Sequence, residues 1–162
     1  MDLIEMALDL EQKTIATYQD LADQCASHEG IRHILQMMVD DHQEHFKSLN
    51  RMREQKQFHP ESPKVFKEIR GLLEKIQHSK DTFSCDIDQL NLYRKALDQV
   101  AEKKRLYEQI RERLETGGGR RLMDVLIKQE DKQAFVLNNI IEMVERPQLW
   151  LEDAEFSHLD EY

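Results

Sequence analysis

Apolar residues recur every three or four positions along most of the chain, which is the spacing of amphipathic helices. Stretches with this pattern run over residues 2–26, 31–57, 64–77 and 87–114, and from the glycines at 117–119 to about 146. No stretch alternates strictly between apolar and polar residues, as a half-buried strand would. The pattern therefore predicts an all-α protein with four long helices and one shorter helix.

Turn signals between these stretches predict how the helices are connected. Ser27–Gly30 and Gly117–Gly119 are tight reversals, and short reversals make the helices on either side antiparallel neighbours. The segment His59–Pro63 stops the second helix, and Ser79–Asp86 forms a loop before the third long helix. We expect a four-helix bundle of two antiparallel hairpins, joined by a long crossover that carries the short extra helix.

The last part of the chain, residues 147–162, is acidic but rich in large apolar side chains. It begins at Pro147, where the fourth helix ends, and carries Trp150, Leu151, Phe156, Leu159 and Tyr162. A purely disordered end has few such residues. We expect one bundle domain over residues 1–146, with a tail over 147–162 that packs on it.

The charge and cysteine content of the chain limit the classes of molecule that it can bind. The 162 residues carry a net charge of -9, which argues against binding to nucleic acid or to an anionic membrane. No run approaches membrane-spanning length and the N-terminus has no basic segment followed by an apolar one, so we expect a cytoplasmic protein. Cys25 and Cys85 stand far apart without CxxC spacing and cannot form a four-cysteine iron centre.

Four ionisable residues interrupt the apolar faces of the predicted helices: Glu11, His42, His45 and Glu130. Burying such groups is costly unless they are paired, hydrogen-bonded or bound to a metal. His42 and His45 are three residues apart and share a helix face. Two imidazoles and two carboxylates directed at one point suit a single Zn, Fe(II) or Mn ion. We therefore predict a metal site in the centre of the bundle.

The sequence also permits a metal-free interior. The two imidazoles can form a hydrogen-bonded pair with Glu11 as partner. Glu130 can pair with Lys103 or Lys104, which lie about one turn beyond Val100 on the facing helix. Whether Glu130 is a ligand or an ion-pair partner stays open at this point.

Other polar residues near these positions have simpler expected roles. Gln133 suits a neutral hydrogen-bond partner, and Tyr18 and Tyr107 suit core aromatics whose hydroxyls bond the central carboxylates. Asp41 is expected either on a solvated face or in a supporting bond to a histidine.

At these residues the chain resembles the rubrerythrin-like branch of the ferritin-like superfamily. The similarity rests on the spacing of Glu11 and Tyr18, on His45, on Glu130 and on the closing segment RPQLWLEDAEFSHLDEY. The resemblance implies a di-iron bundle, with one Glu from each of two helices and a Glu-x-x-His motif from each of the other two. It matches Glu11 to the Glu of helix one, His45 to the first motif's His and Glu130 to the second motif's Glu.

The chain departs from that ligand pattern at three positions. His42 stands where the first motif has its Glu, Val100 stands at the Glu of helix three, and Gln133 replaces the His of the second motif. The resemblance then implies an incomplete set, which makes a normal di-iron centre improbable. One ion per chain, Fe or Zn with Mn as a third choice, remains the expected cofactor.

Two functions follow from these expectations. The first is a ferritin-like metal-binding protein with an altered, mononuclear site in iron or peroxide and oxygen redox chemistry. As an oxidoreductase of rubrerythrin type it would need an external electron donor, because no rubredoxin module is present. The alternative is a non-catalytic bundle that has lost metal chemistry and acts by dimerisation or partner binding. We expect a homodimer, while the substrate and the catalytic residues are not assigned by the sequence.

Overall fold

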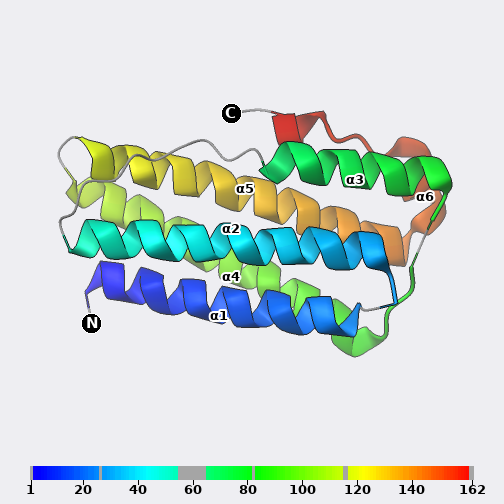
Figure 1. Ribbon diagram of the computed structural model, residues 1–162, viewed down its shortest axis with the longest axis horizontal. Coiled ribbons are helices and arrows are strands. Elements are labelled where there is room, and N and C mark those ends of the chain that lie inside the picture. Colours follow the sequence, from blue (N-terminus) through cyan, green and yellow to red (C-terminus); the bar gives the residue numbers. More distant parts are fainter. Residues whose placement is uncertain (1, 26, 55–64, 82, 115–116, 161–162) are drawn as a thin grey trace.

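The protein is a bundle of long helices in a computed structural model that describes residues 2–25, 27–54, 65–81, 83–114 and 117–160 (Figure 1). The four long helices are α1 (Leu3–Gln24), α2 (Glu29–Arg53), α4 (Ile87–Arg113) and α5 (Gly118–Glu145). The shorter elements are α3 (Val65–Ser79), α6 (Pro147–Asp153) and the 3-10 turn η1 (Ser157–Asp160). The described residues contain no strand.

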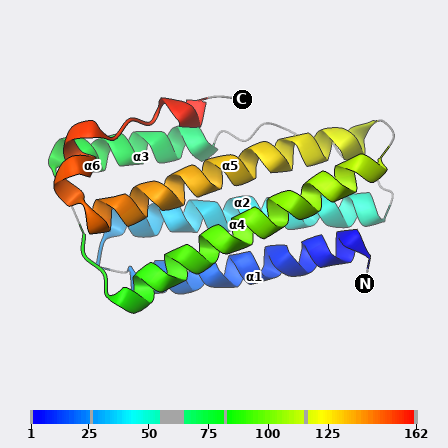
Figure 2. The ribbon, with the colours of Figure 1, turned by 180° about the vertical axis from the view of Figure 1, so that it is seen from behind.

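The helices are arranged as two antiparallel hairpins. Helix α1 packs against α2, α4 packs against α5, and the hairpins meet through α1 with α4 and α2 with α5 (Figures 1 and 2). Helix α3 lies on α2, while α6 and η1 lie on α5 and α3 at the same side of the bundle. This confirms the predicted all-α bundle with a long crossover, an extra helix and a packed tail. The division at residue 146 into a domain and a tail stays a prediction.

Side-chain caps fix where three of the helices begin. Before α1, Asp2 Oδ1 accepts a hydrogen bond from Glu5 N at 2.8 Å, and before α4, Asp86 Oδ1 accepts one from Gln89 N at 2.9 Å. Before α2, His28 Nδ1 accepts a hydrogen bond from Ile31 N at 3.1 Å. The predicted reversal at residues 27–30 is therefore too long, because Glu29 and Gly30 already belong to the helix.

Other helix boundaries also differ from the predicted ones. Helix α3 continues to Ser79, two residues beyond the predicted end, and Pro147 starts α6 as well as following α5. Helix α2 ends at Arg53, so the predicted end at 57 is four residues too late. The predicted helix stop at 59–63 and Tyr162 lie outside the described residues.

The core consists of two apolar clusters separated by a layer of buried polar residues. Helix α1 contributes Leu10 to one cluster and Tyr18 to the other, and α5 contributes Leu126 and Val136 in the same way. Between these positions lie the buried residues Glu11, His42, His45, Lys103 and Glu130. The apolar face of each long helix is thus interrupted near its middle, and the antiparallel packing brings the interruptions to one level.

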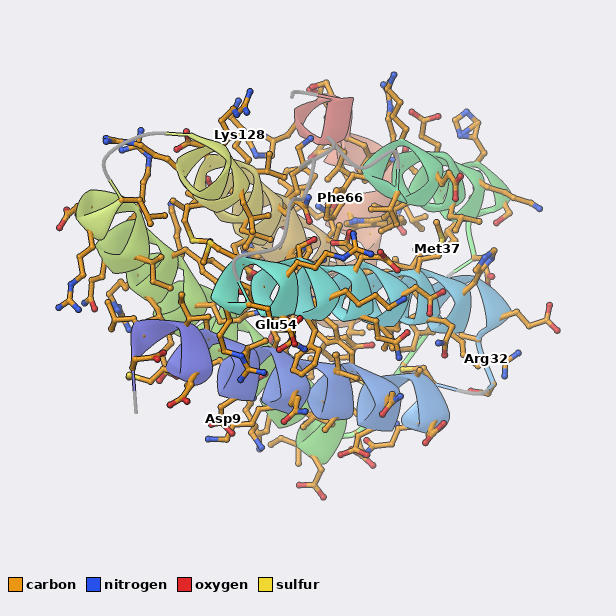
Figure 3. All side chains as sticks on the ribbon, turned by 60° about the vertical axis from the view of Figure 1, so that its left-hand side comes forward. Asp9, Arg32, Met37, Glu54, Phe66 and Lys128 are labelled. Carbon is orange, nitrogen blue, oxygen red and sulfur yellow. The ribbon has the colours of Figure 1, made fainter. Side chains whose placement is uncertain are left out.

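Charged side chains line the outside of the bundle. Arg32 and Lys128 point away from it, whereas Phe66 of α3 is 1% exposed and packs toward the four long helices (Figure 3). Among the described residues, no helix is both apolar and long enough to cross a membrane.

The chain after α5 packs on the bundle through apolar contacts and side-chain hydrogen bonds. Trp150 is 1% exposed, and its Nε1 donates to Asn139 Oδ1 of α5 at 2.9 Å. Gln77 Nε2 of α3 donates to the carbonyl oxygen of Ala154 at 2.9 Å. Phe156 and Leu159 are also buried. The end of the chain therefore ties the crossover helix to the second hairpin.

Leu159→Ala is expected to lower the free energy of unfolding by about 2 to 5 kcal/mol, because it removes a fully buried side chain from a packed core. The matched control is Leu149→Ala, whose side chain is 40% exposed and whose loss should cost under about 1 kcal/mol. Urea unfolding followed by circular dichroism measures both. Equal losses in the two variants would show that the tail does not contribute to the core.

Candidate metal centre

Three of the long helices bring the predicted ligands together. Glu11 comes from α1, His42 and His45 from α2, and Glu130 from α5. One nitrogen or oxygen atom of each lies within 4.8 Å of the corresponding atoms of the others. Glu11, His42 and Glu130 are fully buried, and His45 is 4% exposed. The four side chains converge, while their role as ligands stays a prediction.

Glu11 is the most strongly bonded of the four. Its Oε2 lies 2.7 Å from His42 Nδ1, and its Oε1 accepts a hydrogen bond from the Tyr107 hydroxyl. Burial acts to raise the pKa of Glu11, but the nearby Lys103 ammonium and His42 lower it well below its ordinary value. Glu11 is therefore held as a carboxylate, and the Tyr107 bond is as predicted.

His45 is held from one side only. Its Nε2 lies 3.2 Å from Asp41 Oδ2 and is hydrogen-bonded to the side-chain oxygen of Gln129, so this nitrogen carries a proton and donates. Its Nδ1 accepts or donates no hydrogen bond within the described structure and lies 3.7 Å from Glu11 Oε1. Of the two predicted places for Asp41, the structure shows the supporting bond to a histidine, and Asp41 is only 8% exposed.

The charge on His45 follows from its neighbours. Burial acts to lower the pKa of His45, but the carboxylates of Asp41 and Glu11 outweigh it and raise the pKa to about 9. Without a metal, His45 is therefore an imidazolium at neutral pH. A metal ion bound at Nδ1 would take the place of a proton.

Lys103, rather than Lys104, contacts Glu130. The Lys103 side chain is fully buried, with Nζ 3.0 Å from Glu130 Oε1 and 3.6 Å from Glu11 Oε1. Lys104 instead pairs with Asp131 at 2.9 Å on the surface. Burial raises the pKa of Glu130 above its ordinary value by more than Lys103 lowers it, and neither carboxylate oxygen accepts a hydrogen bond from the described residues.

Two of the three positions that depart from the family ligand pattern, Val100 and Gln133, carry no replacement ligand. Val100 is 4% exposed and apolar, and Gln133 Nε2 donates to Asp41 Oδ2 at 3.3 Å, as expected of a neutral partner. The predicted bond from the Tyr18 hydroxyl to a carboxylate is wrong, since that hydroxyl has no hydrogen-bond partner among the described residues. The Tyr18 ring lies against His42 instead, with ring centroids 5.3 Å apart.

Gln129 is the residue of the site that the sequence reasoning missed. It lies three positions after Leu126 and four before Gln133, so it belongs to the same buried face of α5. A glutamine at such a position is the available signal, because its amide must find a partner in the interior.

The donors that converge here fit a divalent ion. They are imidazole nitrogens and carboxylate oxygens, which Zn, Fe(II) and Mn(II) all accept. Two of their atoms, His42 Nε2 and Glu130 Oε2, are buried with neither a hydrogen bond nor an ion-pair partner among the described residues. Orphaned atoms of this kind are rare in protein interiors unless something binds them.

Comparison with known protein families matches residues 2–141 to the family described as rubrerythrin. Neither the curated proteins nor the solved structures include a match to the chain. The matched range contains all four candidate ligands together with Lys103.

The raised pKa of His45 predicts how stability of the metal-free protein depends on pH. Because its pKa is about 9 in the folded chain and 6.5 as the ordinary value, its contribution is complete below pH 6.5 and is lost as the pH rises to 9. The loss corresponds to about 3 kcal/mol. Thermal melting of chelator-treated protein between pH 6 and 9.5 measures it.

His45→Gln is expected to flatten this decline, whereas the exposed His33→Gln should leave it unchanged. Equal slopes in the wild type and in His45→Gln would contradict the assignment of the proton to His45.

Proposed function

The chain belongs to the rubrerythrin family of the ferritin-like superfamily, and from that premise we propose that it binds one divalent metal ion at the centre of the bundle. Glu11, His42 and His45 hold the ion, with Glu130 as fourth ligand. Iron is the first choice and zinc the second, with manganese also compatible with the donors.

The observation that carries this proposal is the arrangement of His45. Its Nε2 is fixed by Asp41 and Gln129, while Nδ1 faces the cluster without a hydrogen-bond partner among the described residues. Metal-binding histidines commonly hold their second nitrogen in this way, since the bond orients the ring and raises its basicity. Glu11 Oε1 lies 3.7 Å from this nitrogen, beyond hydrogen-bonding distance, so Nδ1 is available to an ion that Glu11 also binds.

Four features support one ion rather than two. Val100 supplies no donor on α4, and Gln133 is engaged with Asp41. His42 cannot bridge two ions as a carboxylate can. The Lys103 ammonium adds a positive charge at the centre, and a second divalent ion would have to overcome it.

We further propose that the bound metal is iron and that it reacts with peroxide or oxygen. Iron bound here would supply one-electron chemistry. The protein's own residues exclude water, as the four ligands are nearly or fully buried, and Tyr107 fixes the orientation of Glu11. These 162 residues hold two cysteines, too few for a four-cysteine iron centre, so we propose that electrons for repeated turnover come from a one-electron donor outside them.

A second candidate function is favoured by the Lys103 and Glu130 ion pair. The pair places a positive charge beside the carboxylates without any metal, with Nζ 3.0 Å from Glu130 Oε1. A protein that had lost its metal chemistry would need such compensation to keep its core. In that case the bundle acts by dimerisation or by binding a partner.

The double variant His42→Ala, His45→Ala is expected to lose the metal. Wild-type protein purified without an affinity tag should contain one ion per chain, and the double variant less than about a tenth of that, because only carboxylates remain at the centre. Elemental analysis by mass spectrometry measures the content. The matched control is His33→Ala, His78→Ala, which removes two exposed imidazoles instead.

Two ions per chain would contradict the single site. Equal metal content in the double variant and in the control would contradict binding at the centre, and a metal-free wild type that also fails to take up added Fe(II) or Zn(II) would favour the second candidate function.

The redox part of the proposal predicts a stoichiometry. Each Fe(II)-loaded chain supplies one electron, so two chains should be oxidised for each hydrogen peroxide reduced to water. Anaerobic mixing followed by electron paramagnetic resonance should show the signal of isolated high-spin Fe(III). If Fe(II) in the loaded protein is oxidised no faster than free Fe(II), the role in peroxide chemistry is wrong even where metal binding holds.

A further inference from the structure

We propose that Lys103 determines the metal affinity of the centre, because its ammonium is the resident cation of the cluster and a metal ion must displace it to bind. The inference rests on the proposed function for its metal-binding half. Its other half, the neutralisation of the buried carboxylates, holds in the metal-free protein and can be measured there.

The Lys103 ammonium occupies the kind of position that a metal ion would take, among the side chains proposed as ligands. Lys103 Nζ lies 3.0 Å from Glu130 Oε1, 3.6 Å from Glu11 Oε1 and 3.4 Å from His42 Nδ1. These three residues are among the four that converge within 4.8 Å. The ammonium thus lies close to three of the four candidate ligands, in the space that a metal ion shared by them would need.

Lys103 reaches the cluster from α4, the long helix that contributes no candidate ligand. It lies one turn beyond the apolar Val100. Its whole side chain is buried, whereas Lys104 at the next position is turned to the surface and pairs with Asp131. A lysine is buried in this way only where its charge is paired. The helix that contributes no carboxylate to the cluster therefore supplies a cation to it.

The charges at the centre explain why a metal ion must displace the ammonium in order to bind. Two carboxylates face the ammonium, from Glu11 and Glu130, and the charge of Lys103 already opposes theirs. A divalent ion held by the same carboxylates would strongly repel the ammonium, because both charges would lie in the buried centre of the bundle. This repulsion is relieved when the ammonium moves away. The ion pairs of Lys103 are then lost, and their loss lowers the affinity of the centre for the metal.

The test compares Lys103→Met with Lys104→Met, using Co(II) as the probe and its visible absorption as the readout. Methionine keeps most of the length and the apolar character of the lysine stem but carries no charge. We expect Lys103→Met to bind Co(II) at least about tenfold more tightly than the wild type and to melt at a lower temperature without metal. Lys104→Met should change neither property appreciably, because its pair is solvent-exposed. Co(II) binding by Lys103→Met that is equal to or weaker than that of the wild type would overturn the inference.

A second comparison keeps the inference falsifiable if Lys103→Met is too unstable to load. The metal-free double variant Lys103→Met, Glu130→Gln should melt above Lys103→Met alone, because the carboxylate left without its cation is removed as well. If the double variant melts no higher, Lys103 is not the counter-ion and the inference fails. The double variant can melt higher while neither the wild type nor Lys103→Met binds Co(II). In that case the proposed function fails, and so does the displacement of Lys103 by a metal. The role of Lys103 as counter-ion of Glu130 then stands.

Discussion

Carboxylates without access to water must be neutralised, and this constraint shapes the middle of the molecule. Glu11 and Glu130 are fully buried, and Asp41 nearly so. Each faces a positive group: Glu11 and Glu130 face Lys103, and Asp41 faces the imidazolium of His45. Removing one member of such a set leaves an uncompensated buried charge. This lowers the free energy of unfolding more than replacing the whole pair by apolar residues would. Tyr107 and Gln133 add to this compensation by donating hydrogen bonds to Glu11 and Asp41.

The polar layer also fixes how the helices align. Each long helix passes from one apolar cluster to the other, and its polar residues stand between the two. Sliding α1 by one turn would place Glu11 against leucines and leave His42 Nδ1 without its partner. Apolar side chains tolerate such exchanges, since a leucine packs against many neighbours. The charged layer therefore provides specificity of register that the apolar clusters alone would not.

Much of this could be predicted from residue types and spacing. Helical periodicity, with tight reversals and a long connection between them, defined the bundle, and ionisable residues at apolar positions identified the four side chains that converge. The choice between Lys103 and Lys104 could not be made, because both lie about one turn beyond Val100 and only the packed backbone decides which side chain points inward. The start of α2 was misplaced since histidine is an unusual helix cap. Helix α6 was missed because Pro147 both follows one helix and begins another.

Trp150 is the only tryptophan of the chain, and it lies where α6 meets α5. Its ring is nearly fully buried, 5.9 Å from that of Phe156 between centroids, and its indole nitrogen is bonded to Asn139. The tryptophan fluorescence of the protein therefore originates from the junction between the tail and the second hairpin. Release of the tail would shift that emission while the helical circular dichroism signal stayed nearly constant, so the two spectroscopic signals separate detachment of the chain end from unfolding of the hairpins.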